Sequence, residues 1–477
     1  MSKAKLTAIA LLCLVIACAA ELQAGSKLVL SSTTYSAYSA AEASTVYANV
    51  TAPTYTIPDF ASYWVRPDLL VQSYTNFPTT PISPLSGIGG FTICSTHSAN
   101  GTVIDRLRVA TGQGFIQVAV SPSESYPLIA ASSYLSIGLP GVPRTPYLLT
   151  VYTYNANGSI NHTAKSVLDW SSLATNPISP TTTTYTGGSA FITGTGYLVY
   201  TLTLSDASGV PTGQAIGIVQ ISADGSTITP IVQVAAPLSP NYFMYTQPNI
   251  VSLATSTGYD LIIGFGGFVP NVLGAFTNAA VVSYRFNVAA KTLVQTGIQY
   301  LPGLIEGIAF NDLDNSLVIL TDPATSGASL WSNPTAPFNN GCQQPSSNFR
   351  LYIYLPVGSN YLRFVDGSNL ATNTFSAHWV DSDALVMTVS DKYSLTGYYG
   401  YLSLFTPPVV SAAGPAVANG ASSLRLYRYF PLLKKFALVD AQPVAPYAAN
   451  IAVTGSKVAV TGQDTPLMRG LSIFTVQ

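Results

Sequence analysis

The chain has 477 residues, of which only 8% are charged, and its 19 basic side chains almost balance its 20 acidic ones. A net charge of -1 provides no basic surface that would attract nucleic acid, so we expect no nucleic-acid partner. Hydrophobic residues make up 48% of the chain and aromatic residues 11%, which excludes an intrinsically disordered protein because such chains lack the apolar surface for a core.

The first residues are typical of an export signal. Lys3 and Lys5 precede a run over 6–17 that is apolar except for Thr7 and is too short to cross a bilayer as a helix. Small residues at the end of 1–20 suit cleavage there, so we expect a removed signal peptide and a secreted, extracellular protein. The string that ends at Cys18 also fits the pattern before an acylated cysteine, so a lipid anchor through Cys18 is the alternative.

Two cysteines remain after removal of the signal, Cys94 and Cys342. An even pair in an exported chain predicts one disulfide, although Cys94 lies in an apolar run and would also fit as a buried thiol. A second hydrophobic stretch, 261–284, contains Gly, Pro and Asn residues that break it into strand, loop and strand. We therefore expect no transmembrane segment.

A two-strand pattern recurs seven times along the rest of the chain. In 251–264, a strand of apolar and small residues leads through a polar tight turn into a more hydrophobic strand. Short runs of β-branched and aromatic residues between clusters of Gly, Pro, Ser and Asn are typical of all-β proteins. The other six copies lie at 61–73, 118–131, 190–202, 307–320, 376–389 and 451–460.

A hairpin with a polar tip follows most copies, and in 216–234 the tip contains Asp224-Gly225, a strong hairpin signal. Four-stranded units at intervals of about 65 residues predict a seven-bladed β-propeller. The last unit has only three strands before the chain ends, so an N-terminal strand, at 27–31 or 45–51, must complete it and close the ring. None of the units carries the Trp-Asp dipeptide at its expected place.

This organisation predicts an N-terminal segment over 21–59 that holds the ring-closing strand, followed by a single propeller domain over 60–477. In such a ring, the first and third turns of each blade share one face, and the connection between the second and third strands lies on the other. Connections longer than about 12 to 15 residues are usually functional or disordered, so we expect the second face to bind partners. The long connections are 77–89, 133–146, 265–279, 322–349 and 391–421.

Aromatic side chains concentrate in the last two of these connections. Tyr and Trp offer large amphipathic contact areas, which suit protein or sugar partners, although the same rings could pack their own loops against the blades. The candidate binding residues are Trp331, Phe338, Tyr393, Tyr398, Tyr399 and Tyr401.

Few residues could carry catalysis. His378 belongs to an expected inner strand, and with Glu306 at the start of the preceding inner strand it could form a weak acid–base pair at the central channel. We expect His97 and His162 to be solvated at hairpin tips. Acidic residues at expected turns are explained by turn chemistry, so we expect no metal site and no cofactor.

Four sequences fit the N-glycosylation acceptor pattern, and their number is what chance gives in a chain so rich in Ser and Thr. Asn100 and Asn157 occupy equivalent hairpin tips, which makes them the more accessible pair; the other two are Asn49 and Asn161. One basic cluster, formed by Arg425, Arg428, Lys434 and Lys435, has the alternation of a solvated rim.

These features favour a secreted, non-enzymatic propeller that acts as an interaction or structural module for proteins or glycans. The near-zero net charge removes the repulsion between copies, so assembly into a coat, matrix or filament is compatible with the composition. The alternative is a secreted propeller enzyme, a carbohydrate or lactone hydrolase or lyase, with its site at the central channel.

Overall fold

The structure is a computed structural model, and the parts of the chain that it describes consist almost entirely of β-strands. The described residues are 26–37, 54–78, 91–109, 115–135, 148–173, 183–205, 211–236, 242–243, 250–268, 276–301, 304–311, 316–322, 350–355, 363–369, 373–381, 383–390, 422–430, 435–444, 450–465 and 468–477.

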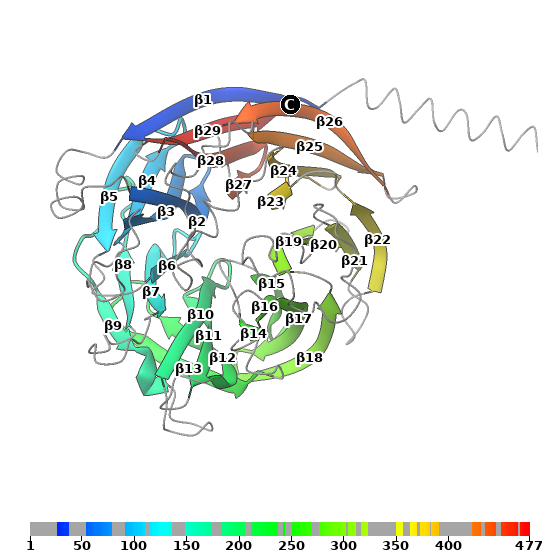
Figure 1. The fold of residues 1–477 in the computed structure, drawn as a ribbon. Helices are drawn as coiled ribbons and strands as arrows, with labels where there is room; N and C mark the ends of the chain where they lie inside the picture. Colours follow the sequence, from blue (N-terminus) through cyan, green and yellow to red (C-terminus); the bar gives the residue numbers. More distant parts are fainter. Residues whose placement is uncertain are drawn as a thin grey trace, which may run out of the picture.

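Within these residues the strands form seven antiparallel sheets arranged around a common axis (Figure 1). In six of them four strands follow one another from the inside outward. The remaining sheet has a fifth strand, because β14 (Tyr242–Phe243) and β15 (Ile250–Ala254) share the inner position beside β16 (Gly258–Phe268). The alternation of turn-forming and strand-forming residues that marks each unit in the sequence therefore corresponds to one blade.

Blade 1 consists of β2 (Thr54–Arg66), β3 (Leu69–Pro78), β4 (Phe91–Ser98) and β5 (Val103–Val109), and blade 2 of β6 (Phe115–Val120), β7 (Leu128–Leu135), β8 (Leu148–Thr153) and β9 (Ser166–Asp169). Blade 3 consists of β10 (Thr183–Phe191), β11 (Tyr197–Ser205), β12 (Pro211–Ile221) and β13 (Ile228–Ala235). Blade 4 consists of β14 (Tyr242–Phe243), β15 (Ile250–Ala254), β16 (Gly258–Phe268), β17 (Phe276–Asn287) and β18 (Thr292–Leu301). Blade 5 consists of β19 (Leu304–Asn311), β20 (Ser316–Asp322), β21 (Arg350–Leu355) and β22 (Arg363–Asn369). Blade 6 consists of β23 (Asn373–Trp379), β24 (Ala384–Ser390), β25 (Ser422–Phe430) and β26 (Lys435–Val444). Blade 7 consists of β27 (Asn450–Thr454), β28 (Lys457–Thr465), β29 (Met468–Val476) and β1 (Leu28–Ala37).

The two ends of the described chain meet in blade 7. β1 pairs antiparallel with β29, and the backbone groups of Lys27 and Gln477 exchange hydrogen bonds of 2.8 and 3.0 Å. The prediction of a seven-bladed β-propeller closed by an N-terminal strand is confirmed, with the strand at the first of the two predicted positions. The other predicted position, 45–51, lies outside the described residues.

Blade 6 also holds the closing strand. The backbone N–H of Leu28 donates to Asp440 Oδ2 at 2.8 Å, and the Arg428 guanidinium donates to both Asp383 and Ser26. The expectation that Arg428 belongs to a solvated rim is therefore wrong, because its planar fork bridges a turn of blade 6 and the residues that lead into β1.

Small residues on the inner strands allow the blades to converge. Four alanines occupy the same register in four blades, since each pairs with the third residue of the second strand of its blade: Ala119, Ala190, Ala309 and Ala452. All four are buried. The space between neighbouring sheets narrows toward the axis, so larger side chains are placed farther out, on the second and third strands, where they form the core.

The second hydrophobic stretch is made of strands, as predicted. β16 extends to Phe268 and β17 begins at Phe276, so the connection is shorter than the expected 265–279. The ladder continues because Gly266 and Gly267 of β16 also pair with the short inner strand β14. Among the described residues, no helix has the length and apolar character that a membrane crossing requires.

Almost every outer strand carries a β-bulge at an equivalent position. At the bulge, two residues of the outer strand lie opposite a single residue of the third strand of the same blade. A bulge kinks an edge strand and increases its twist, which hinders pairing with another chain. The bulged residues, on six of the seven outer strands, are Ser31, Ile104, Ile231, Thr296, Val365 and Val439.

Candidate functional site

Several predicted site residues fall on parts of the chain that the structure does not describe. These are the aromatic loop residues Trp331, Phe338, Tyr393, Tyr398, Tyr399 and Tyr401, together with Cys342 and Asn49. Cys94 is buried in β4, in the core between blades 1 and 2. The aromatic binding surface and the Cys94–Cys342 disulfide therefore stay predictions.

The candidate acid–base pair lies on neighbouring inner strands at different heights. Glu306 is the bulged residue of β19, because Ile305 pairs with Thr321 and the next paired residue is Gly307. The equivalent bulged residue of β23 is Phe375, three positions before His378. At about 3.3 Å per residue, the backbone positions of Glu306 and His378 are offset by about 10 Å along the strands. The Glu306 side chain is outside the description, so the pair stays a prediction.

His378 itself is held as a neutral side chain. Burial lowers its pKa from 6.5 to about 4, because removal from water disfavours the imidazolium form. Its neighbour Trp379 packs against Tyr429 and Phe436, with ring centroids 6.4 and 6.1 Å apart. A histidine with this pKa is neutral at pH 7, so it lacks the imidazolium proton that a general acid would donate.

The lowered pKa of His378 predicts a pH-dependent stability. Between pH 6.5 and pH 4 the unfolded chain binds a proton at this histidine and the folded chain does not, so the free energy of unfolding falls as the pH falls. A difference of about 2.5 pKa units corresponds to about 3 kcal/mol. Urea unfolding at about pH 4.5 and about pH 7.5 should show that His378→Gln removes this part of the dependence. Equal pH dependence in His378→Gln and the unsubstituted protein would contradict a neutral His378 in the folded chain.

Three consecutive blades share one turn between their third and fourth strands. The turns read Ser-Ala-Asn-Gly-Thr at 98–102, Asn-Ala-Asn-Gly-Ser at 155–159 and Ser-Ala-Asp-Gly-Ser at 222–226. In each one the glycine has a positive φ, of 84°, 87° and 74°, and donates its N–H to the carbonyl of the first residue. The Asn or Asp side chain accepts the N–H two residues later, at 3.2, 3.0 and 3.1 Å.

The geometry of this turn alone accounts for the glycosylation sequences at Asn100 and Asn157, so their presence is not evidence that a glycan is attached. The left-handed backbone requires glycine, the side-chain oxygen before it must accept a hydrogen bond, and a hydroxyl follows. Blade 3 meets the same requirements with Asp224, whose pKa is lowered to about 2 by the Ser222 hydroxyl and by the N–H and hydroxyl of Ser226. Asn100 and Asn157 thus fit the turn as Asp224 does, and both are exposed.

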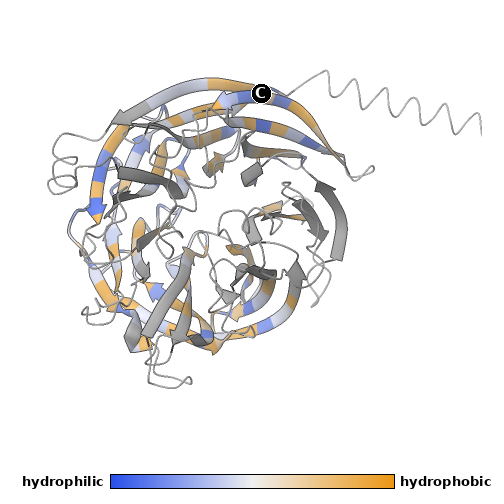
Figure 2. Cartoon of the chain, viewed as in Figure 1, coloured by the Kyte–Doolittle hydropathy of each residue, from blue (hydrophilic) through white to orange (hydrophobic). Residues whose placement is uncertain are grey.

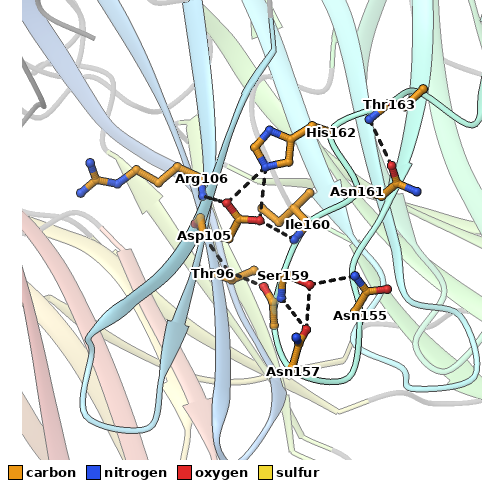
Figure 3. Close-up of polar contacts among 11 residues, drawn as sticks. Thr96, Asp105, Arg106, Asn155, Asn157, Ser159, Ile160, Asn161, His162 and Thr163 are labelled. Atoms are coloured by element: carbon orange, nitrogen blue, oxygen red, sulfur yellow. Dashed lines mark hydrogen bonds and ion pairs between the residues drawn. The ribbon is translucent and has the colours of Figure 1, made fainter. Parts of the chain in front are cut away.

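The turn of blade 2 is fastened to blade 1 (Figure 3). Asp105 of β5 accepts the backbone N–H of Ile160 at 2.7 Å, and both of its oxygens lie 3.2 Å from His162 Nε2. Partial burial opposes ionisation of Asp105, but the N–H groups of Ile160 and Arg106 and the His162 side chain outweigh it, so its pKa lies below the ordinary value. The Thr96 hydroxyl adds a bond of 2.6 Å to the Gly158 carbonyl.

Asn161 follows directly in the same loop. Its side-chain oxygen accepts the backbone N–H of Thr163 at 3.2 Å, the same contact that Asn157 makes with Ser159 (Figure 3). Asn161 is half-buried whereas Asn157 is exposed. Because Asp105 holds the backbone between the two asparagines, Asn157 is the more accessible of the pair.

His97 differs from the prediction of a solvated histidine. It is 3% exposed, because β4 continues through Ser98 and His97 lies within the strand and not at its tip. Its Nδ1 lies 3.1 Å from the Gly101 carbonyl and its Nε2 lies 2.9 Å from the Ser95 hydroxyl. A carbonyl only accepts hydrogen bonds, so Nδ1 carries the proton and Ser95 donates to Nε2.

The first and third turns of the blades lie on one face of the ring, and polar contacts link these turns from blade to blade. The links run from blade 7 to blade 4: Lys457 Nζ to the Pro67 carbonyl at 2.8 Å, Arg66 Nη2 to the Ala156 carbonyl at 2.8 Å, the Ser121 hydroxyl to the Thr195 carbonyl at 3.2 Å, and the Thr193 N–H to the Ser252 hydroxyl at 3.4 Å.

The large apolar side chains that the described part of the chain exposes all lie on outermost strands. Figure 2 shows hydrophobic residues along these strands at the circumference of the ring. The exposed residues are Val29 and Leu30 on β1, Ile104 on β5, Val167 on β9, Val294 and Ile298 on β18, and Leu438 on β26. This surface could not be predicted from the sequence, because the residue pattern of a strand does not distinguish an outermost strand from a covered one.

No protein-family model and no curated protein matches the sequence. Solved structures with the same kind of fold do match. They include the WD40 repeats of RRP9, with 8% identity over 90% of this chain and 98% of that one (TM-score 0.44), and a periplasmic gluconolactonase from Pseudomonas aeruginosa, with 12% identity over 81% and 91% (TM-score 0.41). The β-propeller domain of the Trilobed protease from Pyrococcus furiosus is 9% identical over 88% and 93% (TM-score 0.39). These likenesses concern the β-propeller fold alone.

Proposed function

We propose that the protein is a secreted, non-enzymatic β-propeller that serves as an extracellular interaction or structural module. Its partners would be proteins, glycans or further copies of the chain, including assembly into a coat, matrix or filament. The observation that carries this proposal is the gathering of exposed large apolar side chains on the outermost strands of the ring. A partner that covers these side chains would remove their apolar area from water, which favours association.

The charge of the molecule supports the same proposal. A chain of 477 residues with a net charge of -1 has little electrostatic repulsion between copies, and a net charge near zero promotes association. The predicted binding face, formed by the long connections between second and third strands, would add a second surface for a different partner.

Light scattering on the mature protein tests the proposal. We expect the average mass to rise as the protein concentration increases, and to fall again on dilution. A constant monomer mass, together with no retention on immobilised glycans or on an extracellular fraction of the source cells, would contradict an interaction module.

Glycosylation follows from secretion and can be tested through the shared turn. In a secretory cell that glycosylates, Asn100→Gln and Asn157→Gln should each remove one glycan, measured by the mass lost on amidase treatment. Asp224→Asn creates an Asn-Gly-Ser acceptor in the same turn of blade 3 and should add one glycan. A glycan at the position substituted in Asp224→Asn, with none at Asn100 or Asn157, would contradict the view that the three turns are equally accessible.

A further inference from the structure

The outermost strands differ in how they are protected against pairing with another chain. An outermost strand has a partner on one side only, and proteins protect such edges with charged residues, Pro, bulges or short length. Three of the seven outer strands carry charges in the strand interior: β5 has Asp105, β22 has Asp366 and β26 has Asp440. Two others are protected differently, because β9 has only 4 residues and β13 contains Pro230.

β1 and β18 lack these protections among their own residues, although Asp440 of β26 accepts the backbone N–H of Leu28 at the first residue of β1. Each has 10 residues, with no charged residue and no Pro, and a bulge is the only protection that they share with the others. Each also presents two exposed large apolar side chains, Val29 and Leu30 on β1 and Val294 and Ile298 on β18. Among the outer-strand side chains that the structure describes, no other strand presents more than one. Long, uncharged and apolar edge strands are predicted sites of association.

We infer that β18 of one copy docks against β1 of a second copy of this chain. The inference rests on the proposed function and names the surface that would serve it. The charges fit a second copy as occupant. Neither strand contains an ionised side chain that the contact would have to desolvate, and the carboxylate beside the start of β1, Asp440, keeps its bond to the Leu28 N–H. The two molecules also carry almost no net charge.

The position of the two strands determines what such contacts build. β18 belongs to blade 4 and β1 to blade 7, so they lie three blades apart on opposite sides of the ring (Figure 1). A contact between two different surfaces is heterologous, and it produces an open chain of copies unless the rotation between them closes a ring. The arrangement therefore yields a linear assembly of propellers joined at their rims.

Lysine substitutions at matched positions test the inference. Val294→Lys blocks β18, and Val167→Lys is its control, because the two valines are 57% and 55% exposed on different outer strands. Leu30→Lys blocks β1, and Leu438→Lys is its control, with exposures of 51% and 49%. Association is measured by sedimentation velocity over a concentration series, and the unfolding temperature of each variant is measured alongside.

We expect each blocking variant alone to remain monomeric at concentrations where the unsubstituted protein and both controls associate. A mixture of Val294→Lys and Leu30→Lys copies should form a one-to-one dimer and nothing larger, since the free β1 of one meets the free β18 of the other. Dimer formation in the mixture also shows that both variants are folded.

Other outcomes overturn the inference in distinguishable ways. If the blocking variants associate as the unsubstituted protein does, the contact lies elsewhere, and the proposed function stands without this surface. If each variant alone forms dimers that the mixture does not change, the contacts join like strands and the linear arrangement is wrong. If the unsubstituted protein stays monomeric but binds a glycan or an extracellular protein, self-association fails while the proposed function survives.

Discussion

Leu28→Ala should lower the free energy of unfolding by about 2 to 5 kcal/mol, the range for removing a buried leucine side chain. Leu28 is only 3% exposed and packs in the core between blades 6 and 7, with Val386, Leu424 and Phe474 among its neighbours. This residue therefore connects the first described strand to the last blades of the ring.

The adjacent Leu30→Ala provides a matched control, because Leu30 lies on the same strand but is 51% exposed. We expect it to cost less than about 1 kcal/mol, as surface substitutions usually do. Urea unfolding followed by circular dichroism measures both variants. Equal effects of the two substitutions would mean that β1 does not bury one side against the ring.

Trp170→Ala should cost about 3 to 5 kcal/mol, because it removes the largest fully buried side chain of the described residues. The indole fills the core between blades 2 and 3, donates from Nε1 to the Ser132 hydroxyl at 2.9 Å, and lies 4.8 Å from the Tyr200 ring. Its loss would leave a cavity and an unpaired hydroxyl together.

Trp170→Phe separates these two contributions. It keeps most of the volume but lacks the Nε1 donor, so we expect a smaller loss than for Trp170→Ala, and Ser132→Ala should remove the need for that donor. Thermal unfolding of the three variants gives the order of effects. A loss for Trp170→Phe as large as that for Trp170→Ala would show that the hydrogen bond, and not the packing, dominates.

The blades could be predicted from the sequence because their first two strands leave a strong local pattern. The copy at 451–460 corresponds to β27 and β28, and the copy at 190–202 to β10 and β11. The missing fourth strand of the last unit also predicted that β1 closes the ring. Local alternation and turn chemistry were sufficient for these features.

Other features depend on contacts between distant residues and left no local signal. Trp170 follows β9 in a short 3-10 helix, Trp170–Leu173, and its burial is decided by blade 3. The prediction that His97 is solvated at a hairpin tip was wrong because β4 extends one residue beyond it, to Ser98, and the His97 side chain is buried within the strand. The exposed apolar surface of β18 follows from its outermost place in the sheet, which tertiary structure alone determines.

A cross-link between β1 and β29 tests the closed ring most directly. Thr33 and Ser472 are paired residues, and their hydroxyl oxygens lie 3.4 Å apart, so Thr33→Cys with Ser472→Cys has the spacing for a disulfide. After oxidation, mass spectrometry should find these two positions joined within one chain, whereas Thr33→Cys with Ser226→Cys should give no such link. Absence of the link in folded protein, or its presence only between separate chains, would contradict a ring that each chain closes with its own first strand.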